Sequence, residues 1–310
     1  MHKDLSEILY QFQTPYYYYK MDLLEAVLTN LHQEASKYNY HIHYALKANN
    51  QERIVKEICK AGLGADCVSG GEVAFALEQG FSPEKIFFAG VGKTDMEIEF
   101  ALDNGIFAFN VESLHELEVI QELASQKDVK AGIMLRMNPD LDAHTHAHIS
   151  TGKEEHKFGI PEHEIPRAIA LINNSPLLDF KGLHVHIGSQ IMDMEVFKSL
   201  ALRVNQIQSY FVEAGLPCEH LNLGGGLGID YADPHLHPIA DFASYFKAVY
   251  DNLKVEAHQQ VHFELGRSIV GPIGTLISKV LYLKEHGKHQ FAIIDASMTD
   301  LIRPALYGAQ

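Results

Sequence analysis

The sequence predicts an α/β fold, a (β/α)8 barrel of the TIM type followed by the beginning of a C-terminal β-domain. Eight short apolar runs each end in polar or glycine residues, and a stretch with helical periodicity follows each of them. The connections between these elements are short, as expected for neighbouring strands of one parallel sheet. A doubly wound open sheet is the alternative for the same order of elements.

The predicted strands are short, mostly apolar runs. They are residues 42–48, 63–68, 86–89, 107–111, 132–137, 182–187, 221–224 and 261–265. The predicted helices have apolar residues three or four positions apart on one face. They are residues 21–36, 52–59, 71–79, 95–103, 113–124, 164–172, 196–213 and 242–252.

The two ends of the chain differ from the barrel in the types of residue that they contain. Near the start, Pro15 and the four tyrosines that follow it favour an extended segment. After Leu265 the sequence is rich in β-branched residues and glycine. We therefore expect an extended segment at 1–20 that pairs with the β-domain, a barrel at 21–268, and a partial β-domain at 269–310 that is cut short.

Composition limits the classes of partner. The 310 residues include 25 basic and 40 acidic side chains, a net charge of −15, which argues against nucleic acid and anionic membranes as partners. No apolar run approaches a membrane span, and the N-terminus lacks the form of a signal peptide. The three cysteines, Cys59, Cys67 and Cys218, have no CxxC spacing, which suggests free thiols in a reducing cytoplasm.

Lys47 stands at the end of the first predicted strand, and the active site of such a barrel lies at the carboxyl ends of its strands. Burial there would lower the pKa of the lysine and make a neutral amine available for a Schiff base. For a lysine taken alone, a surface position at a strand end is the commoner role. The residues at the ends of the other predicted strands distinguish between these two interpretations.

A glycine run follows the seventh predicted strand, at Gly224, Gly225, Gly226 and Gly228. Backbone N–H groups without neighbouring Cβ atoms can approach an anion closely, and phosphate sites recur after the seventh and eighth strands of barrels. Arg267 could supply a charged fork to the same phosphate or to a carboxylate. A tight turn is the alternative interpretation of the run.

Glu264 ends the eighth predicted strand, where an unpaired carboxylate would be costly. A ring nitrogen that must stay protonated would justify the carboxylate, and a structural salt bridge is the alternative. His184 and His186 share one face of the sixth strand and could form a metal pair, as could His144 to His148. The further ligands that zinc needs do not fall on the other strand ends, so we expect no metal site.

A lysine, a phosphate cradle, a carboxylate for a ring nitrogen and a flat histidine together describe a site for pyridoxal 5′-phosphate. Several segments then show a family resemblance. They are residues 44–49, 64–72, 138–146, 157–160, 184–190, 224–228 and 300–307. From about Thr14 to the end, the sequence closely resembles the diaminopimelate decarboxylases. The lysine motif is shared with ornithine and arginine decarboxylases, whereas segments 186–190 and 303–307 point more narrowly to diaminopimelate.

The resemblance implies an alanine-racemase-like barrel that decarboxylates meso-2,6-diaminopimelate to L-lysine, the last step of lysine biosynthesis. It implies that Lys47 forms the Schiff base, His186 stacks on the cofactor ring, Glu264 pairs with the pyridine nitrogen and Asp66 lies near both the cofactor and Lys47. Lys47 and His186 are the expected catalytic residues. An ornithine or arginine decarboxylase of the same fold and a non-catalytic homologue that binds pyridoxal phosphate are the alternatives.

The resemblance also implies the residues around the phosphate and the substrate. Around the phosphate we expect Ser189, Gly224, Gly225, Gly226 and Arg267. Leu265 and Gly266 are also expected to bind the cofactor. Arg267, Arg303 and Tyr307 are expected to bind the substrate. Leu265 stands where the family usually has proline, and little change is expected because leucine can adopt the φ of proline.

The expected general acid of the family is a cysteine in the β-domain, contributed by the partner subunit of a homodimer. That cysteine and a second tyrosine for the substrate are expected beyond Gln310, and the three cysteines of this sequence do not match the motif. We therefore expect the sequence to be a fragment of a cytoplasmic homodimer with a shared active site. Its other partner would be a small amino-acid substrate.

Overall fold

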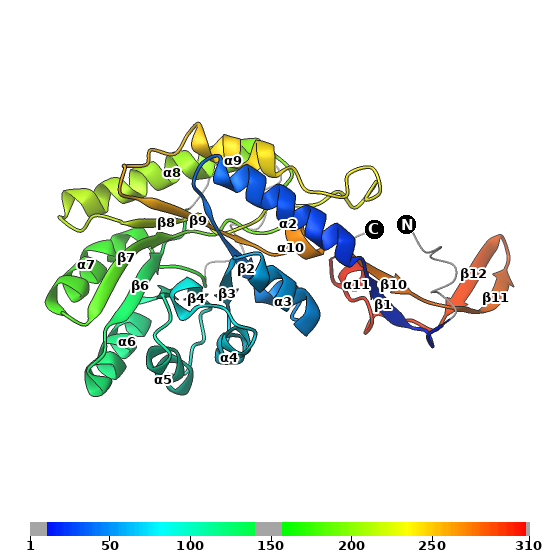
Figure 1. The fold of residues 1–310 in the computed structure, drawn as a ribbon, viewed down its shortest axis with the longest axis horizontal. Helices are drawn as coiled ribbons and strands as arrows, with labels where there is room; N and C mark the ends of the chain where they lie inside the picture. Colours follow the sequence, from blue (N-terminus) through cyan, green and yellow to red (C-terminus); the bar gives the residue numbers. More distant parts are fainter. Residues whose placement is uncertain (1–10, 140–156, 308–310) are drawn as a thin grey trace.

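The computed structural model describes residues 11–139 and 157–307. Within these residues, strands β2 to β9 follow one another in chain order and close into a barrel (Figure 1). The barrel closes because β9 pairs in parallel with β2, with Phe263 opposite Ile42. The predicted (β/α)8 barrel is therefore confirmed, and the open doubly wound sheet is wrong.

Each barrel strand is followed by a helix. The strands are β2 His41–Ala45, β3 Gly64–Cys67, β4 Ile86–Phe88, β5 Ala108–Val111, β6 Ala131–Arg136, β7 Leu178–His184, β8 His220–Asn222 and β9 Gln260–Leu265. The helices that follow them are α3 Glu52–Lys60, α4 Gly70–Glu78, α5 Asp95–Asp103, α6 Leu114–Lys127, α7 Ile165–Asn174, α8 Met194–Glu213, α9 Phe242–Tyr250 and α10 Arg267–Val270. Short 3-10 helices are η1 Leu46–Ala48, η2 Pro83–Lys85 and η3 Glu162–Glu164.

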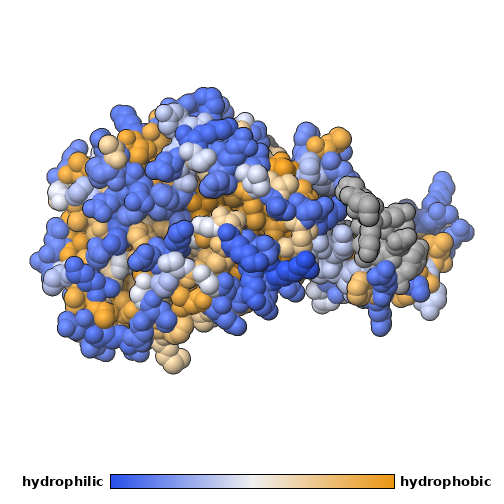
Figure 2. Space-filling view, in the orientation of Figure 1, coloured by the Kyte–Doolittle hydropathy of each residue, from blue (hydrophilic) through white to orange (hydrophobic). Residues whose placement is uncertain are grey.

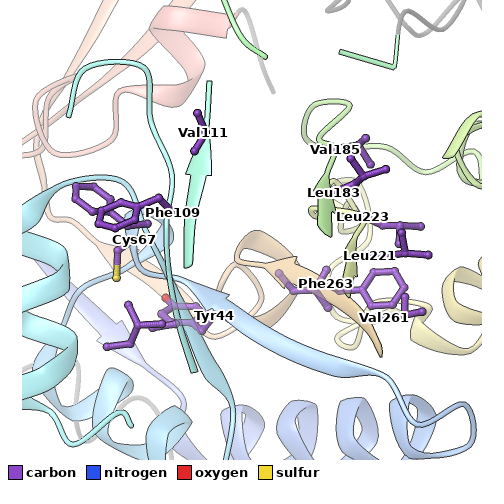
Figure 3. Close-up of a cluster of buried hydrophobic side chains, with 14 of the residues drawn as sticks. Tyr44, Cys67, Phe109, Val111, Leu183, Val185, Leu221, Leu223, Val261 and Phe263 are labelled. Atoms are coloured by element: carbon purple, nitrogen blue, oxygen red, sulfur yellow. The ribbon is translucent and has the colours of Figure 1, made fainter. Parts of the chain in front are cut away.

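Alternation along the strands separates the hydrophobic core from the polar interior. Leu221 and Leu223 flank Asn222, and Val261 and Phe263 flank His262. Successive strand residues point to opposite sides of a sheet, so the apolar members face the helices. Figure 3 shows these apolar side chains in the large cluster that strands and helices share. The polar members of the same strands are left to line the barrel.

The helices begin where the sequence supplies hydrogen-bonding caps. Thr94 and Glu97 form a capping box that starts α5, with the Glu97 carboxylate accepting from the Thr94 backbone N–H at 3.0 Å. Ser69 caps α4, where its hydroxyl accepts a hydrogen bond from the Glu72 N–H at 3.2 Å. These caps fix the loops that follow β3 and β4 on the side where the active site of a barrel is expected.

The remaining elements are a helix on the outside of the barrel and a group of strands with a short helix at one end of the molecule (Figure 1). Helix α2 Met21–Ser36 packs along the barrel beside α9 (Figure 1). Strand β1 Tyr16–Tyr19 pairs antiparallel with β10 Gly274–Ile277, while β11 Val280–His286 pairs with β12 His289–Ile294. Helix α11 Arg303–Tyr307 follows them.

The outer surface is mixed in character. Hydrophilic residues dominate the barrel face that Figure 2 shows, and apolar residues recur on the projecting β11–β12 hairpin. Tyr282, Leu283 and Phe291 of this hairpin are all exposed, Leu283 by 81%. In the described part of the chain, no helix is both long and apolar enough to span a membrane.

Candidate active site

Lys47 lies just past the first barrel strand. Strand β2 ends at Ala45, and Lys47 falls in η1, with a side chain that is 51% exposed. Its Nζ atom lies 3.5 Å from Oδ2 of Asp66, which follows on β3. The negative charge of Asp66 raises the pKa of Lys47, although burial works in the opposite direction. The predicted buried lysine with a lowered pKa is therefore wrong, because a carboxylate pairs with the ammonium group.

Glu264 lies on β9 and is buried, and three side chains of the described residues donate hydrogen bonds to it. Oε1 accepts from the side-chain amides of Asn110 at 3.0 Å and Asn222 at 2.6 Å. Oε2 accepts from Nε2 of His184 at 3.1 Å. Burial alone would raise the pKa of Glu264, but the charges and hydrogen bonds of His184 and the charge of Lys47 lower it well below its usual range. Glu264 is therefore a buried carboxylate that stays ionised.

The pKa of Asp66 is shifted in the opposite direction to that of Glu264. It is buried at 1% exposure, and burial followed by the nearby charge of Glu264 raises its pKa to about 7. Lys47 counteracts part of this rise. Among the described residues, Oδ1 of Asp66 has no hydrogen-bond partner, and neither has Oδ1 of Asn110 or Nδ1 of His184. Three unsatisfied polar atoms thus belong to the residues around Lys47 and Glu264.

His186 lies two residues beyond the end of β7 and contacts the glycine run. Its Nδ1 accepts a hydrogen bond from the N–H of Gly225 at 3.2 Å. Burial, then the charges of Lys47 and Arg136, lower the pKa of His186 to about 3, so the ring is neutral near neutral pH. A neutral ring whose Nδ1 accepts carries its proton on Nε2. The structure therefore presents a flat, uncharged imidazole beside the loop.

The glycine run forms a loop in which several positions require glycine. Gly224 and Gly226 have φ angles of 65° and 110°, in the left-handed region. A Cβ atom on Gly225 would overlap the carbonyl oxygen of Glu264. The run therefore packs directly against the end of β9, next to the buried carboxylate.

Arg267 begins α10, directly after Leu265 and Gly266. Its guanidinium donates to the Ser189 hydroxyl at 3.2 Å and to the Tyr231 hydroxyl at 2.7 Å. Leu265 is buried at the end of β9. Gly266 lies so close to η1 that an added Cβ would be 2.9 Å from Cβ of Ala48.

The two substrate candidates from the C-terminal end lie on α11. The guanidinium carbon of Arg303 lies 3.8 Å from the centre of the Tyr231 ring. Because the Tyr231 hydroxyl also binds Arg267, the two arginines contact the same side chain. Tyr307 is at the end of α11 and is 72% exposed. The structure thus joins Arg303 to the predicted site through Tyr231, a residue that the sequence analysis did not single out.

Arg136, at the end of β6, forms a buried ion pair with Glu112 at 2.6 Å and lies over the ring of Phe158. His144, His146 and His148 lie outside the described residues. Within the residues described, no group of histidine, cysteine, aspartate and glutamate side chains could hold a metal ion.

Some members of the site were missed from the sequence. Asn110 and Asn222 hold Glu264, and His184, considered only as a metal ligand, also binds Glu264. The available signal was a single polar residue between two apolar residues of a strand, as in Leu221-Asn222-Leu223. Such a residue points into the barrel, on the side opposite its neighbours.

Comparison with known proteins identifies the family. Residues 23–271 match the sequence model of the pyridoxal-dependent decarboxylases, in their pyridoxal binding domain. A diaminopimelate decarboxylase from Bacteroides thetaiotaomicron is 51% identical over 298 residues, which cover 96% of this chain and 77% of that protein. This chain belongs to the diaminopimelate decarboxylase family.

Two crystal structures of diaminopimelate decarboxylases in complex with L-lysine have the same fold. The enzyme from Helicobacter pylori has a TM-score of 0.90 at 36% identity and is matched over 99% of this chain and 76% of its own. The enzyme from M. jannaschii has a TM-score of 0.91 at 32% identity, over 99% and 73% of the two chains. The closed barrel of this chain is therefore the barrel of the diaminopimelate decarboxylase family.

Proposed function

We propose that this chain decarboxylates meso-2,6-diaminopimelate to L-lysine, the last step of lysine biosynthesis, with pyridoxal 5′-phosphate as cofactor. The observation that carries the proposal is the identity of 51% to a diaminopimelate decarboxylase over nearly the whole chain. Identity at this level makes the family's reaction the first expectation for this chain. The geometry at the strand ends supports it independently.

The residues present fit the cofactor. Asp66, Asn110 and His184 each have a buried polar atom without a partner among the described residues, and these residues surround Lys47 and Glu264. Buried polar atoms without partners are costly, so such a group indicates that a polar ligand completes the site. When bound, pyridoxal phosphate supplies an electron sink for the pair released from the bond between Cα and the carboxylate.

Each residue can be given a part in holding the cofactor. Lys47 would hold it covalently through the neutral amine, Glu264 would accept a hydrogen bond from the protonated ring nitrogen, and His186 would lie against the ring. Glu264 suits this part because its carboxylate stays ionised while buried. Ser189, Gly224, Gly225, Gly226 and Arg267 would lie around the phosphate, and Leu265 and Gly266 would also contact the cofactor.

Asp66 is the group to which Lys47 would pass a proton. The amine of Lys47 reacts only after it loses a proton, and Oδ2 of Asp66 lies 3.5 Å away. The pKa of Asp66, raised to about 7, lets this carboxylate both take up and release a proton near neutral pH. The pair can therefore exchange a proton without water entering between them.

Arg267, Arg303 and Tyr307 would recognise the end of the substrate that does not react. Ornithine and arginine lack the second carboxylate that diaminopimelate carries there. A site built to bind a polar group can reject an analogue without it by about 10⁴-fold. The two arginines are the basis for selectivity in this proposal.

We also propose a cytoplasmic homodimer whose subunits share the active site. The exposed apolar residues of the β11–β12 hairpin, such as Leu283, support a further protein contact at this end of the molecule. Sedimentation of the protein at several concentrations would measure the oligomeric state, and a monomer throughout would contradict this part of the proposal.

A substrate panel tests the proposed reaction. Release of CO₂ is measured from meso-diaminopimelate, ornithine and arginine with the protein loaded with pyridoxal phosphate. We expect release from diaminopimelate to be at least about 10³-fold faster. Faster release from ornithine or arginine would assign the chain to those decarboxylases, and cofactor binding without any release would make it a non-catalytic homologue.

A further inference from the structure

Tyr231 lies between the two arginines of the candidate site. Its hydroxyl oxygen accepts a hydrogen bond from Arg267 at 2.7 Å, and its ring faces the guanidinium carbon of Arg303 at 3.8 Å from the ring centre. The hydroxyl group and the ring face of one side chain thus contact two different cations. Arg267 and Arg303 come from opposite ends of the C-terminal region, 36 residues apart, and Tyr231 joins them.

The two arginines are available to a ligand. Among the described residues, the ion pairs between arginine and a carboxylate involve Arg136 and Arg203, and neither Arg267 nor Arg303 takes part in one. Two guanidinium groups repel each other, and the negative face of an aromatic ring reduces that repulsion by attracting a cation. Tyr231 therefore stabilises a pair of positive charges that the fold leaves without a counter-charge.

The backbone on both sides of Tyr231 is fixed. Gln190 donates to the carbonyl of Ile229 at 2.7 Å and accepts from the Ile229 N–H at 3.2 Å. On the other side, the Asp230 carboxylate accepts from the N–H groups of Ala232 and Asp233 at 2.9 and 3.0 Å. These bonds hold the segment after the glycine run, so the position of Tyr231 is set by its own loop as well as by the arginines.

We propose that Tyr231 is a positioning residue that holds Arg267 and Arg303 side by side to bind one carboxylate of the substrate. The inference rests on the proposed function, because it takes the unreacted amino-acid end of diaminopimelate as the ligand. Since the hydroxyl oxygen accepts from Arg267, the hydroxyl proton remains available for a further acceptor. A carboxylate has enough lone pairs to accept from both arginines and from Tyr231.

Two substitutions separate the two contacts. Tyr231→Phe keeps the ring beneath Arg303 and removes the hydrogen bond to Arg267, whereas Tyr231→Leu removes both. We expect KM for diaminopimelate to rise about tenfold in Tyr231→Phe and several-fold further in Tyr231→Leu, with kcat within about twofold. Tyr210→Leu, at an exposed position on α8, is the matched control and should leave both constants unchanged.

A binding measurement gives a readout that does not depend on turnover. L-Lysinamide has a neutral amide in place of the carboxylate of L-lysine, and calorimetry gives the affinities of both compounds for the loaded protein. We expect the preference for L-lysine to fall by about tenfold or more in Tyr231→Leu and to fall less in Tyr231→Phe.

The results distinguish the inference from the function on which it rests. If the unaltered protein neither turns over diaminopimelate nor binds L-lysine, the proposed function fails and the inference fails with it. If the unaltered protein does both and the Tyr231 variants keep its KM and its preference for L-lysine, only the inference is overturned. A fall in kcat at constant KM would likewise contradict a role in positioning the arginines.

Discussion

Glu264 and His184 are joined across the barrel interior, with 3.1 Å between Oε2 of the carboxylate and Nε2 of the ring. Asn110 and Asn222 bind the other carboxylate oxygen, so strands β5, β7, β8 and β9 all contribute to one buried group. An ionised carboxylate is tolerated in such a place only when its hydrogen bonds are satisfied. The barrel thus holds a fixed negative charge beside Lys47.

Glu264→Gln removes this charge with little change in shape. We expect kcat to fall on the order of 10²-fold, because an amide cannot stabilise a protonated ring nitrogen as a carboxylate does. Steady-state kinetics with diaminopimelate measure the effect, with thermal unfolding as a check on folding. Glu195→Gln, an exposed position on α8, is the control. A variant that folds and keeps full kcat would exclude the role proposed for Glu264.

Asp66→Asn tests the coupling between Asp66 and Lys47. The charge of Asp66 is the largest cause of the raised pKa of Lys47, so its removal should lower the pKa of the amine. Uptake of pyridoxal phosphate requires the neutral amine, and its rate against pH should therefore have a midpoint at lower pH in the variant. Stopped-flow absorbance measures this profile. An unchanged or higher midpoint would show that Asp66 does not control the amine.

Gly225→Ala tests the contact between the glycine run and β9. The added methyl group would overlap the carbonyl oxygen of Glu264, so the backbone must move. We expect the affinity for pyridoxal phosphate to fall at least about tenfold and the protein to lose about 1–3 kcal/mol of stability. Equilibrium dialysis and urea unfolding measure the two effects. Gly92→Ala, where an added Cβ meets no atom within 4 Å, should change neither.

The amino ends of the barrel strands hold a chain of histidines that was not predicted. Nδ1 of His43 lies 3.2 Å from the carbonyl of Lys85, Nε2 of His43 lies 3.0 Å from Nδ1 of His262, and Nε2 of His262 lies 2.9 Å from Nδ1 of His220. A carbonyl only accepts, so Nδ1 of His43 carries a proton, and in neutral rings each following Nδ1 donates along the chain. Burial lowers the pKa of His43 and of His220 to about 4.

The three hydrogen-bonded histidines should make the folded protein less stable as the pH falls. The unfolded state binds these protons below about pH 6.5, whereas the folded state resists them until about pH 4. The free energy of unfolding should therefore be highest above pH 6.5. It should decrease as the pH falls toward 4, by on the order of 1–3 kcal/mol for each histidine. Urea unfolding from pH 4 to 8 measures the slope. His220→Gln should make it shallower and exposed His258→Gln should not; equal slopes would contradict this explanation.

The barrel was predictable from the sequence because the same pattern recurs along the barrel segment: a short apolar strand, a short connection and an amphipathic helix. Helices 21–36 and 95–103 were even predicted with the bounds that the structure gives to α2 and α5. The environment of Lys47 was not predictable, because its pKa depends on Asp66, which only the pairing of β2 with β3 brings close. Tyr231 was missed for the same reason, since no local pattern places it between Arg267 and Arg303.

We propose that Lys47 is the lysine that binds pyridoxal phosphate covalently, and chemical labelling can identify this lysine. Borohydride reduction of the protein with pyridoxal phosphate, followed by digestion and mass spectrometry, marks the lysine that was bonded to it. We expect the added mass on the peptide that contains Lys47, and not on Lys93, a buried lysine paired with Glu116. Modification of another lysine in place of Lys47, or of no lysine, would show that Lys47 does not hold the cofactor.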